Sequence, residues 1–214
     1  MLARVADHLY WLSRYIERAE ATARLAIAAS DTILDLPEAV PYHWESLMPV
    51  FGATETDERM TEAEVMERLV LSLDNPSSIR ASVASARENA RVTRDMIPKD
   101  AWVALNELHG LLERQSFSGF DRSNRVRLLK QVIAGCRLWH GCLMANQARD
   151  LGWLFLRLGD RLEHADMVSR LVDPRVTQMV PGQSAQWASY EAIGWQNLLS
   201  ALGGVELYRR SASN

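Results

Sequence analysis

Apolar residues recur every three or four positions along nearly the whole chain. The first segment shows this pattern over six turns, with one apolar stripe made of Val5, Leu9, Leu12, Ile16, Ala19, Ala23 and Ile27. Side chains at this spacing share one face of an α-helix. The pattern therefore predicts a long first helix that ends near Leu36, because Pro37 cannot continue it.

Capping and turn residues divide the rest of the chain into further helices. Thr61 followed by Glu64 is the pattern of a capping box, and Asn75 with Pro76 predicts another helix start. Asp121 or Ser123 is expected to cap a long helix. Further helices are expected near 44–50, from Thr61, over 76–95, from Pro98, over 151–172, over 184–202 and over 205–210, with a glycine cap at 203–204 and a turn at 180–182.

No segment alternates between apolar and polar residues as a strand does. Seven or eight helices with mostly short connections predict an all-α helical bundle, organised as a single domain over residues 1–214. The composition agrees, because 48% hydrophobic and 24% charged residues are ordinary values for a globular protein.

The charge balance excludes some classes of partner. A net charge of −3 and a pI near 6.0 give no basic excess for binding nucleic acid. No stretch is long and free enough of charge to span a membrane, and the mixed N-terminus lacks the apolar core of a signal peptide. We therefore expect a cytoplasmic protein that binds neither nucleic acid nor membrane.

The two cysteines, Cys136 and Cys142, lie on one predicted helix. Six residues of helix turn the second thiol about 120° from the first. The pair can therefore share neither a disulfide nor a metal, even with His140 between them. We expect a buried thiol at Cys136 and a partly buried one at Cys142.

Two segments of the chain are similar to each other. LSRYIERAEATARL (12–25) aligns without gaps to LGDRLEHADMVSRL (158–171). The alignment matches Glu17 with Glu163 and Glu20 with Asp166, which goes beyond the apolar periodicity that two amphipathic helices share. We interpret the match as an internal duplication.

The first helix carries charges and aromatic rings on separate faces. At about 100° per residue, Glu17 and Arg18 lie away from the apolar stripe with Tyr10 between them, and Trp11 and Tyr15 lie on one flank. A fully solvated face does not require a tyrosine at its centre. We expect this helix to be covered on several sides and its charges to be paired, since unpaired buried charge is costly.

A second cluster lies in ARENARVTR (86–94). Arg87, Arg91 and Arg94 fall on one helical face, with Glu88 and Asn89 beside them. Adjacent guanidinium groups repel one another unless acids or anions face them. The acids of the first helix are the expected counterparts, and a bound anion such as phosphate is the functional alternative.

The motifs of common catalytic and metal sites are missing from the sequence. There is no phosphate-binding glycine loop, no Glu-x-x-His pair, no zinc pattern of cysteines and histidines, and no Gly-x-Ser-x-Gly elbow. The sequence therefore predicts neither a metal nor a cofactor.

Three motifs together resemble one known family. MLARVADHLYWLSRYIERAEATARL, NPSSI with ARENAR, and WLFLRLGDRLEHAD are similar, in this order, to segments of the alpha-E proteins, a bacterial all-helical family with a Glu-Arg motif. The resemblance places that motif at Glu17 and Arg18, followed by Ala19 and Glu20. The second copy matches at 163, 165 and 166.

The chain departs from the family pattern at several positions. His164 stands where the second copy usually has arginine, Asp160 where a basic residue is common, and Ser13 where glycine is usual. Family members also usually continue for another helical subdomain, which we expect to be missing here.

The resemblance implies which proteins this chain works with, and it does not assign a reaction to the chain. Alpha-E proteins are associated with a circularly permuted ATP-grasp protein and a transglutaminase-like protease. This suggests an accessory role in an amidoligase system. The candidate polar cluster comprises Arg14, Glu17, Arg18, Glu20, Arg87, Glu88, Asn89, Arg91, Glu163 and Asp166.

Two alternatives stay open. In the first, Glu17 and Glu163 point into a shared cavity and act as acid and base on peptide or amide substrates. In the second, the charges are buried ion pairs of a purely structural bundle.

Overall fold

The computed structural model describes residues 1–35, 44–51, 59–116, 121–172 and 191–212. Within these ranges all regular structure is helical and no strand occurs, so the predicted all-α class is confirmed. The elements are α1 (Ala3–Asp35), the 3-10 helix η1 (Trp44–Phe51), α2 (Glu62–Val70), α3 (Ile79–Val92), the 3-10 turn η2 (Arg94–Met96), α4 (Lys99–Glu113), α5 (Arg122–Asn146), α6 (Leu151–Val172), α8 (Glu191–Ala201) and α9 (Val205–Ala212).

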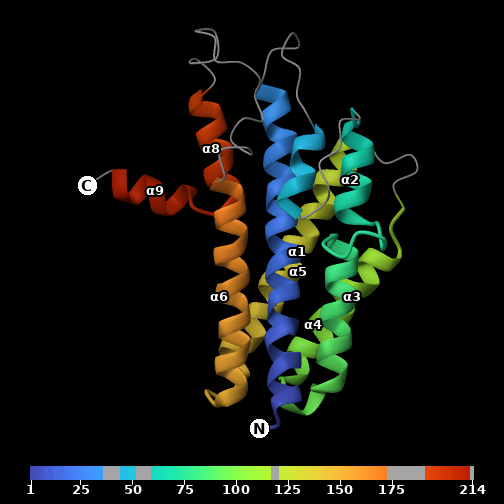
Figure 1. Cartoon of the computed structure of the whole chain (residues 1–214), viewed down its shortest axis with the longest axis vertical. Helices are drawn as coiled ribbons and strands as arrows, with labels where there is room; N and C mark the ends of the chain where they lie inside the picture. Colours follow the sequence, from blue (N-terminus) through green and yellow to red (C-terminus); the bar gives the residue numbers. More distant parts are fainter. Residues whose placement is uncertain (36–43, 52–58, 117–120, 173–190, 213–214) are drawn as a thin grey trace.

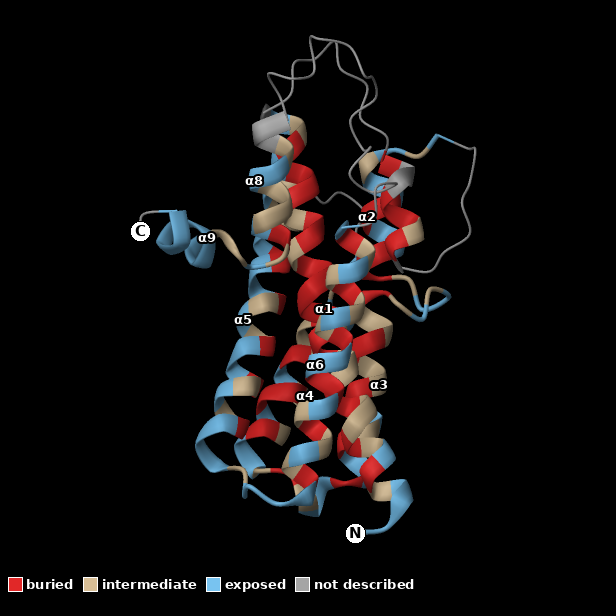
Figure 2. Ribbon diagram, turned by 60° about the vertical axis from the view of Figure 1, so that its left-hand side comes forward, coloured by how far each residue is buried: buried red, intermediate tan, exposed pale blue. Residues whose placement is uncertain are grey.

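Helix α1 is the central element of the bundle. It packs against α3, α5, α6 and α8, while α4 packs on α3 and α5. Figure 1 shows α1 running the length of the molecule between α6 and α3. Most residues of α1 between Leu9 and Ser30 are buried, and Figure 2 shows long red stretches along this helix. The expectation that this helix is covered on several sides is therefore confirmed.

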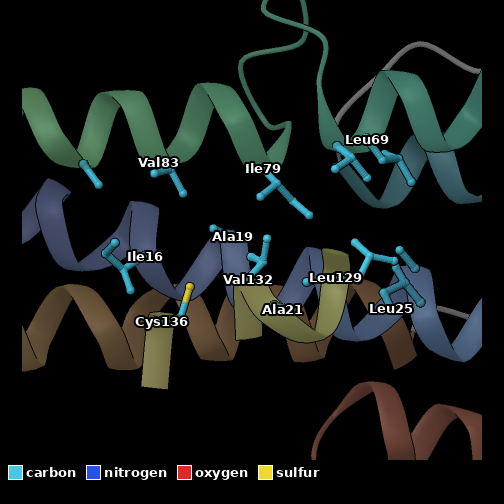
Figure 3. Packing of buried hydrophobic residues seen from close by; sticks show 14 of the residues in the cluster. Ile16, Ala19, Ala21, Leu25, Leu69, Ile79, Val83, Leu129, Val132 and Cys136 are labelled. Atoms are coloured by element: carbon cyan, nitrogen blue, oxygen red, sulfur yellow. The ribbon is translucent and has the colours of Figure 1, made fainter. Parts of the chain in front are cut away.

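The core consists of aliphatic side chains around small residues of α1. Ile16 and Leu25 alternate with alanines such as Ala19, and these residues meet Val83 of α3 and Val132 of α5 (Figure 3). Alanines on α1 allow neighbouring backbones to approach closely, and the burial of the larger side chains provides the main hydrophobic stabilisation.

Helix α6 crosses α1 in backbone contact. A Cβ atom at Gly159 would collide with the carbonyl oxygen of Tyr10, so only glycine fits at this position. The close approach brings the polar side chains of the two helices within reach of each other. Gly159 therefore fixes the geometry on which the site described below depends.

Two of the predicted caps are present as expected. The Thr61 hydroxyl accepts a hydrogen bond from the backbone N–H of Glu64, and the Glu64 carboxylate accepts one from the N–H of Thr61. The Asp121 carboxylate accepts one from the N–H of Asn124 and caps α5. Both pairs satisfy backbone donors that a helix start leaves free.

The expected helix over 76–95 was too long at both ends. Asn75 accepts a hydrogen bond from the N–H of Ser77 and organises a turn, and Ser78 becomes the N-cap by accepting from the N–H of Ala81. Helix α3 ends at Val92, and Arg94 belongs to the following 3-10 turn. The side chains of both Asn75 and Ser78 can bind backbone groups, and the sequence did not show which one starts the helix.

The glycine cap after α8 is also present. Gly203 has φ of +69°, its N–H donates to the Ser200 carbonyl, and the Gly204 N–H donates to the Leu199 carbonyl. These two bonds form the Schellman arrangement that satisfies the last carbonyls of a helix. Three of the other expectations, Pro37, the turn at 180–182 and the helix start at 184, fall outside the described residues.

Both cysteines are free, with Cys136 buried and Cys142 half-buried, as predicted. Burial raises the pKa of the Cys136 thiol well above its usual value, and the negative charges of Glu20 and Glu17 add to this effect.

Among the described residues, no helix combines the length and apolar character that crossing a membrane requires.

Candidate functional site

Glu163, the glutamate of the second of the two similar segments, binds both arginines of the first segment, Arg14 and Arg18. Glu163 is fully buried on α6. Its Oε2 accepts a hydrogen bond of 2.5 Å from Arg14 Nε, and its Oε1 accepts one of 2.6 Å from Arg18 Nε. Arg18 Nη2 adds a bond of 3.1 Å to Oε2. Charge-assisted bonds to a planar guanidinium are the strongest that a carboxylate makes in a protein.

Glu17, the glutamate of the first similar segment, in turn contacts a basic residue of the second segment. Glu17 of α1 is 6% exposed, and its Oε1 lies 2.9 Å from Nδ1 of His164 on α6. The same oxygen accepts a bond of 3.3 Å from Arg24 Nη2. In the alignment of the two segments, Glu17 matches Glu163 and Arg18 matches His164. Each glutamate therefore contacts the basic residue that follows the other one. The duplication itself stays a prediction.

Aromatic rings cover the arginines on α1. The Arg14 guanidinium lies 5.6 Å from the Tyr10 ring centre and 5.2 Å from that of Trp11, and Arg18 lies 5.5 Å from that of Tyr15. Tyr10 also accepts a hydrogen bond of 2.9 Å from Arg14 through its hydroxyl. These contacts explain the dense mixture of rings and charges on this helix, since cations lie favourably over aromatic faces.

The cation at Arg14 is stabilised by its surroundings. Burial acts to lower the pKa of the Arg14 guanidinium, but Glu163 and Tyr10 together raise it above its usual value. Asp166 contributes a weaker contact, with its Oδ2 3.8 Å from Arg14 Nη2 and 3.1 Å from Arg170 Nη2.

Glu20 binds arginines from two helices. Its Oε1 accepts a hydrogen bond of 2.5 Å from Arg24 Nη1 on α1 and one of 3.2 Å from Arg137 Nε on α5. The charges of the Glu-Arg motif are therefore paired, as expected for groups held this far from water.

A pocket of about 360 Å³ opens on the Glu17 side of this network. It lies between α1, α5 and α6, with the end of α8 beside it. Its lining comprises Ser13, Glu17, Glu20, Arg24, Arg137, His140, Leu143, Met144, Trp153, Leu156, Arg157, Asp160, Arg161, His164, Leu202 and Gly203. Glu17 and Glu20 line this pocket, whereas Glu163 lies outside it.

Residues that sequence reasoning did not select complete the pocket. Asp160 is buried on α6, with its Oδ2 3.0 Å from Arg157 Nη1 and its Oδ1 4.0 Å from His140 Nε2. Glu17, His140 and Asp160 each place one potential ligand atom within 4.8 Å of the other two. Asp160 was visible in the sequence as a departure from the family pattern, but nothing in the sequence connected His140 of α5 to it.

The arginines of the second cluster lie elsewhere. Arg87 Nε donates a hydrogen bond of 2.7 Å to Asn106 Oδ1, and the guanidinium groups of Arg87 and Arg94 lie 5.7 and 5.3 Å from the Trp102 ring centre. Asn106 and Trp102 of α4 supply the partners that we expected from the acids of α1. Although α1 also packs on α3, the side chain of Arg87 lies on the face of α3 that meets α4, and Arg94 of η2 lies over Trp102 of α4.

The remaining members of that cluster pair locally or with the start of α1. Glu88 and Arg91 form an exposed pair with 2.6 Å between Oε1 and Nε. The Asn89 side-chain oxygen lies 2.7 Å from His8 Nδ1. None of the four residues Arg87, Glu88, Asn89 and Arg91 lines the pocket.

The comparison with known families identifies the family of this chain. A family model described as a predicted alpha-helical domain with a conserved ER motif, Alpha-E, matches residues 1–214. The chain belongs to the Alpha-E family. In this Alpha-E protein the Glu-Arg motif of α1 and the matching segment of α6 form the interface between the two helices.

The relatives of this Alpha-E protein are uncharacterized. One protein of Mycobacterium bovis is 26% identical over 97% of this chain, and one of Mycobacterium tuberculosis is 25% identical over the same share. The chain spans only 25% of the length of each of these relatives. No solved structure matches the chain significantly.

Proposed function

We propose that this Alpha-E protein is a helical accessory component of an ATP-dependent amidoligase system and binds a circularly permuted ATP-grasp protein. A transglutaminase-like protease is the second partner in this proposal. The resemblance of three motifs to the family supports the setting. The length of the mycobacterial relatives also supports it, because there a region similar to this chain is joined to other sequence in one polypeptide.

The observation that carries the proposal is a row of exposed leucines on α6. Leu151, Leu154, Leu158 and Leu162 are between 45% and 58% exposed. At about 100° per residue they lie within about 80° of one another around the helix. An apolar row of this kind on a surface helix is typical of a protein interaction site.

The row lies on the helix that also carries Glu163. Figure 2 shows exposed segments alternating with buried ones along α6, and the buried Gly159 and Glu163 lie against α1. The Glu-Arg network, which comprises Arg14, Glu17, Arg18, Glu163 and His164, lies at the other face of this helix. A partner bound to the leucines would therefore contact the same rigid helix that carries part of this network. The geometry supports a docking role in which the network fixes the position of the binding surface.

The test is co-purification of the 214-residue chain with a circularly permuted ATP-grasp protein from the same organism, followed by ATP turnover with and without the chain. We expect a stable complex and a change in turnover. A double variant, Leu154→Arg with Leu158→Arg, should lose both. The control is Leu207→Arg, which changes a more exposed leucine on α9 and should retain them. Failure of the wild-type chain to associate or to change turnover contradicts the proposal.

The pocket favours a second candidate function, an enzyme that acts on peptide or amide substrates. Glu17 lines the pocket, so in this candidate it acts as the acid or base, while Glu163 with its guanidinium partners has a structural role. Amide-bond cleavage or formation by the isolated chain, abolished in Glu17→Gln, would favour this function over the first. Inactivity under conditions that support partner binding would exclude it.

A further inference from the structure

Three atoms at the pocket have no hydrogen-bond partner among the described residues. Both bonds to Glu17 end on Oε1, which leaves Oε2 without one. The hydrogen bond to Asp160 ends on Oδ2, while its Oδ1 lies 4.0 Å from His140 Nε2, too far for a hydrogen bond. The Nε2 atom of His140 is itself buried and accepts or donates no bond. Of the three, only His140 Nε2 is a buried atom, and a buried polar atom without a partner is uncommon and calls for an explanation.

We propose that Glu17, His140 and Asp160 bind one divalent transition-metal ion in this pocket. One potential ligand atom from each residue lies within 4.8 Å of the other two, and the residues come from three helices, α1, α5 and α6. Ligands about 2.1 Å from a single ion lie at most about 4.2 Å apart, so a small inward movement of the side chains completes the site.

The surroundings of Glu163 and of Glu17, the two ends of the Glu-Arg network, differ in charge. A bound cation would remove this difference. Glu163 contacts two guanidinium groups, those of Arg14 and Arg18. The alignment places Asp160 at the position of Arg14, so Glu17 faces an acid where Glu163 faces a cation. A dication between Glu17 and Asp160 would supply the charge that Arg14 supplies at the other end.

The donor set identifies the class of ion. One imidazole nitrogen and two carboxylates suit Zn²⁺, Fe²⁺ or Mn²⁺, whereas Ca²⁺ and Mg²⁺ favour all-oxygen sites. Three protein ligands leave positions open to water or substrate, as in catalytic metal sites. His164 on Glu17 Oε1 and Arg157 on Asp160 Oδ2 hold the two carboxylates in place, which is the usual role of groups around metal ligands.

Positive charge in the same pocket opposes the ion. Arg24, Arg137, Arg157 and Arg161 line it together with Glu20. Arg137 and Arg161 have side chains that are 65% and 66% exposed, so water and salt screen their charges, and Arg24 and Arg137 already pair with Glu20. Arg157 and Arg161 pair with the proposed ligand Asp160 and compete with the ion for it. We therefore expect weaker binding than at a site lined by acids alone.

The test titrates Zn²⁺ into the chelator-treated, full-length chain by calorimetry and records the visible absorption of the Co²⁺ form. We expect one saturable ion per chain and a raised Tm. His140→Ala and Asp160→Asn should each weaken binding by at least about tenfold and abolish the Co²⁺ bands. His109→Ala, which removes a half-buried histidine of α4, is the matched control and should bind as the wild type does.

Several results would overturn the proposal. These are the absence of saturable binding to the wild-type chain, unchanged binding in His140→Ala, or an equal loss in His109→Ala. Circular dichroism establishes that each variant is folded, and either variant decides the question if the other does not fold. The proposal concerns the isolated chain, so it does not depend on whether the ATP-grasp protein binds.

Discussion

The two ends of the Glu-Arg network use the same residue in different ways. At one end Glu163 is fully buried, and two guanidinium groups occupy its carboxylate. At the other end Glu17 meets an imidazole and a more distant arginine, and it faces a pocket with Asp160 and His140. The first end holds the two helices together, whereas the second retains room and free ligand atoms for chemistry.

This difference shows that similar motifs do not have to share a role. A closed ion-pair cluster adds little net stability, yet the loss of one partner leaves costly unpaired charge. A half-open cluster tolerates the loss of a partner better because water enters the pocket. Three substitutions and one experiment on the unchanged chain test the comparison.

The largest effect is expected for Glu163→Gln. The change removes the fully buried carboxylate that pairs with Arg14 and Arg18, and it should lower the free energy of unfolding by about 3–5 kcal/mol. Urea denaturation measures the loss. Glu206→Gln, which removes an exposed pair on α9, is the control and should stay within about 0.5 kcal/mol of the wild type. A loss below that of Glu17→Gln would reverse the comparison.

Gly159→Ala should disturb both ends together. The new methyl group collides with the Tyr10 carbonyl and moves α6 away from α1. We expect a loss of about 1–3 kcal/mol in thermal or urea unfolding.

The control for this change is Gly141→Ala on α5, where a new Cβ meets nothing within 4 Å. This alanine should stabilise the protein by about 0.5–1 kcal/mol, because glycine weakens a helix interior. If the free energy of unfolding falls in Gly159→Ala and rises in Gly141→Ala, the close crossing is confirmed. Changes of the same sign in both variants would contradict it.

Glu17→Gln should lower the free energy of unfolding by about 1–2 kcal/mol, which is less than the loss expected for Glu163→Gln. The amide keeps the shape of the side chain, and Arg24 retains Glu20 as a partner. Equal losses at the two glutamates in the same urea experiment would show that the pocket leaves Glu17 as poorly solvated as Glu163.

The smallest effect concerns the thiol beside the Glu17 end. Burial, with the charges of Glu20 and Glu17, raises the pKa of Cys136 well above its unfolded value. Since the folded state holds this proton more tightly, the associated stability is present below the ordinary thiol pKa and is lost as the pH rises above it.

Urea denaturation at increasing alkaline pH measures this loss of stability, and alkylation with iodoacetamide reports how well the fold protects the thiol. Cys136 should react only as the chain unfolds, and Cys142, whose pKa burial raises less, should react in the folded protein. Fast alkylation of Cys136 in the folded chain would show that this side of the network is open to solvent.

Much of the helical architecture could be predicted from local patterns. The stripe from Val5 to Ile27 and the Thr61 cap depend on spacings of three or four residues, and the structure contains both. The start of α3 was misplaced because Asn75 and Ser78 are both good capping residues.

The candidate site was only partly predictable. The alignment selected Glu17, Arg18 and Glu163, which the structure brings into one network. It also grouped Arg87 with them, although Asn106 binds that side chain. His140 was missed because its approach to Asp160 depends on how α5 and α6 each pack against α1.

The sequence by itself determined that this chain is helical, where most of its helices lie, and that the charges on its first helix require partners. The reason is that helix periodicity and capping act between residues that are near in the chain. Only the tertiary structure decided which glutamate is closed off and which faces a pocket. That choice depends on the crossing of α1 and α6 at Gly159 and on contacts between residues 147 positions apart, such as Glu17 and His164.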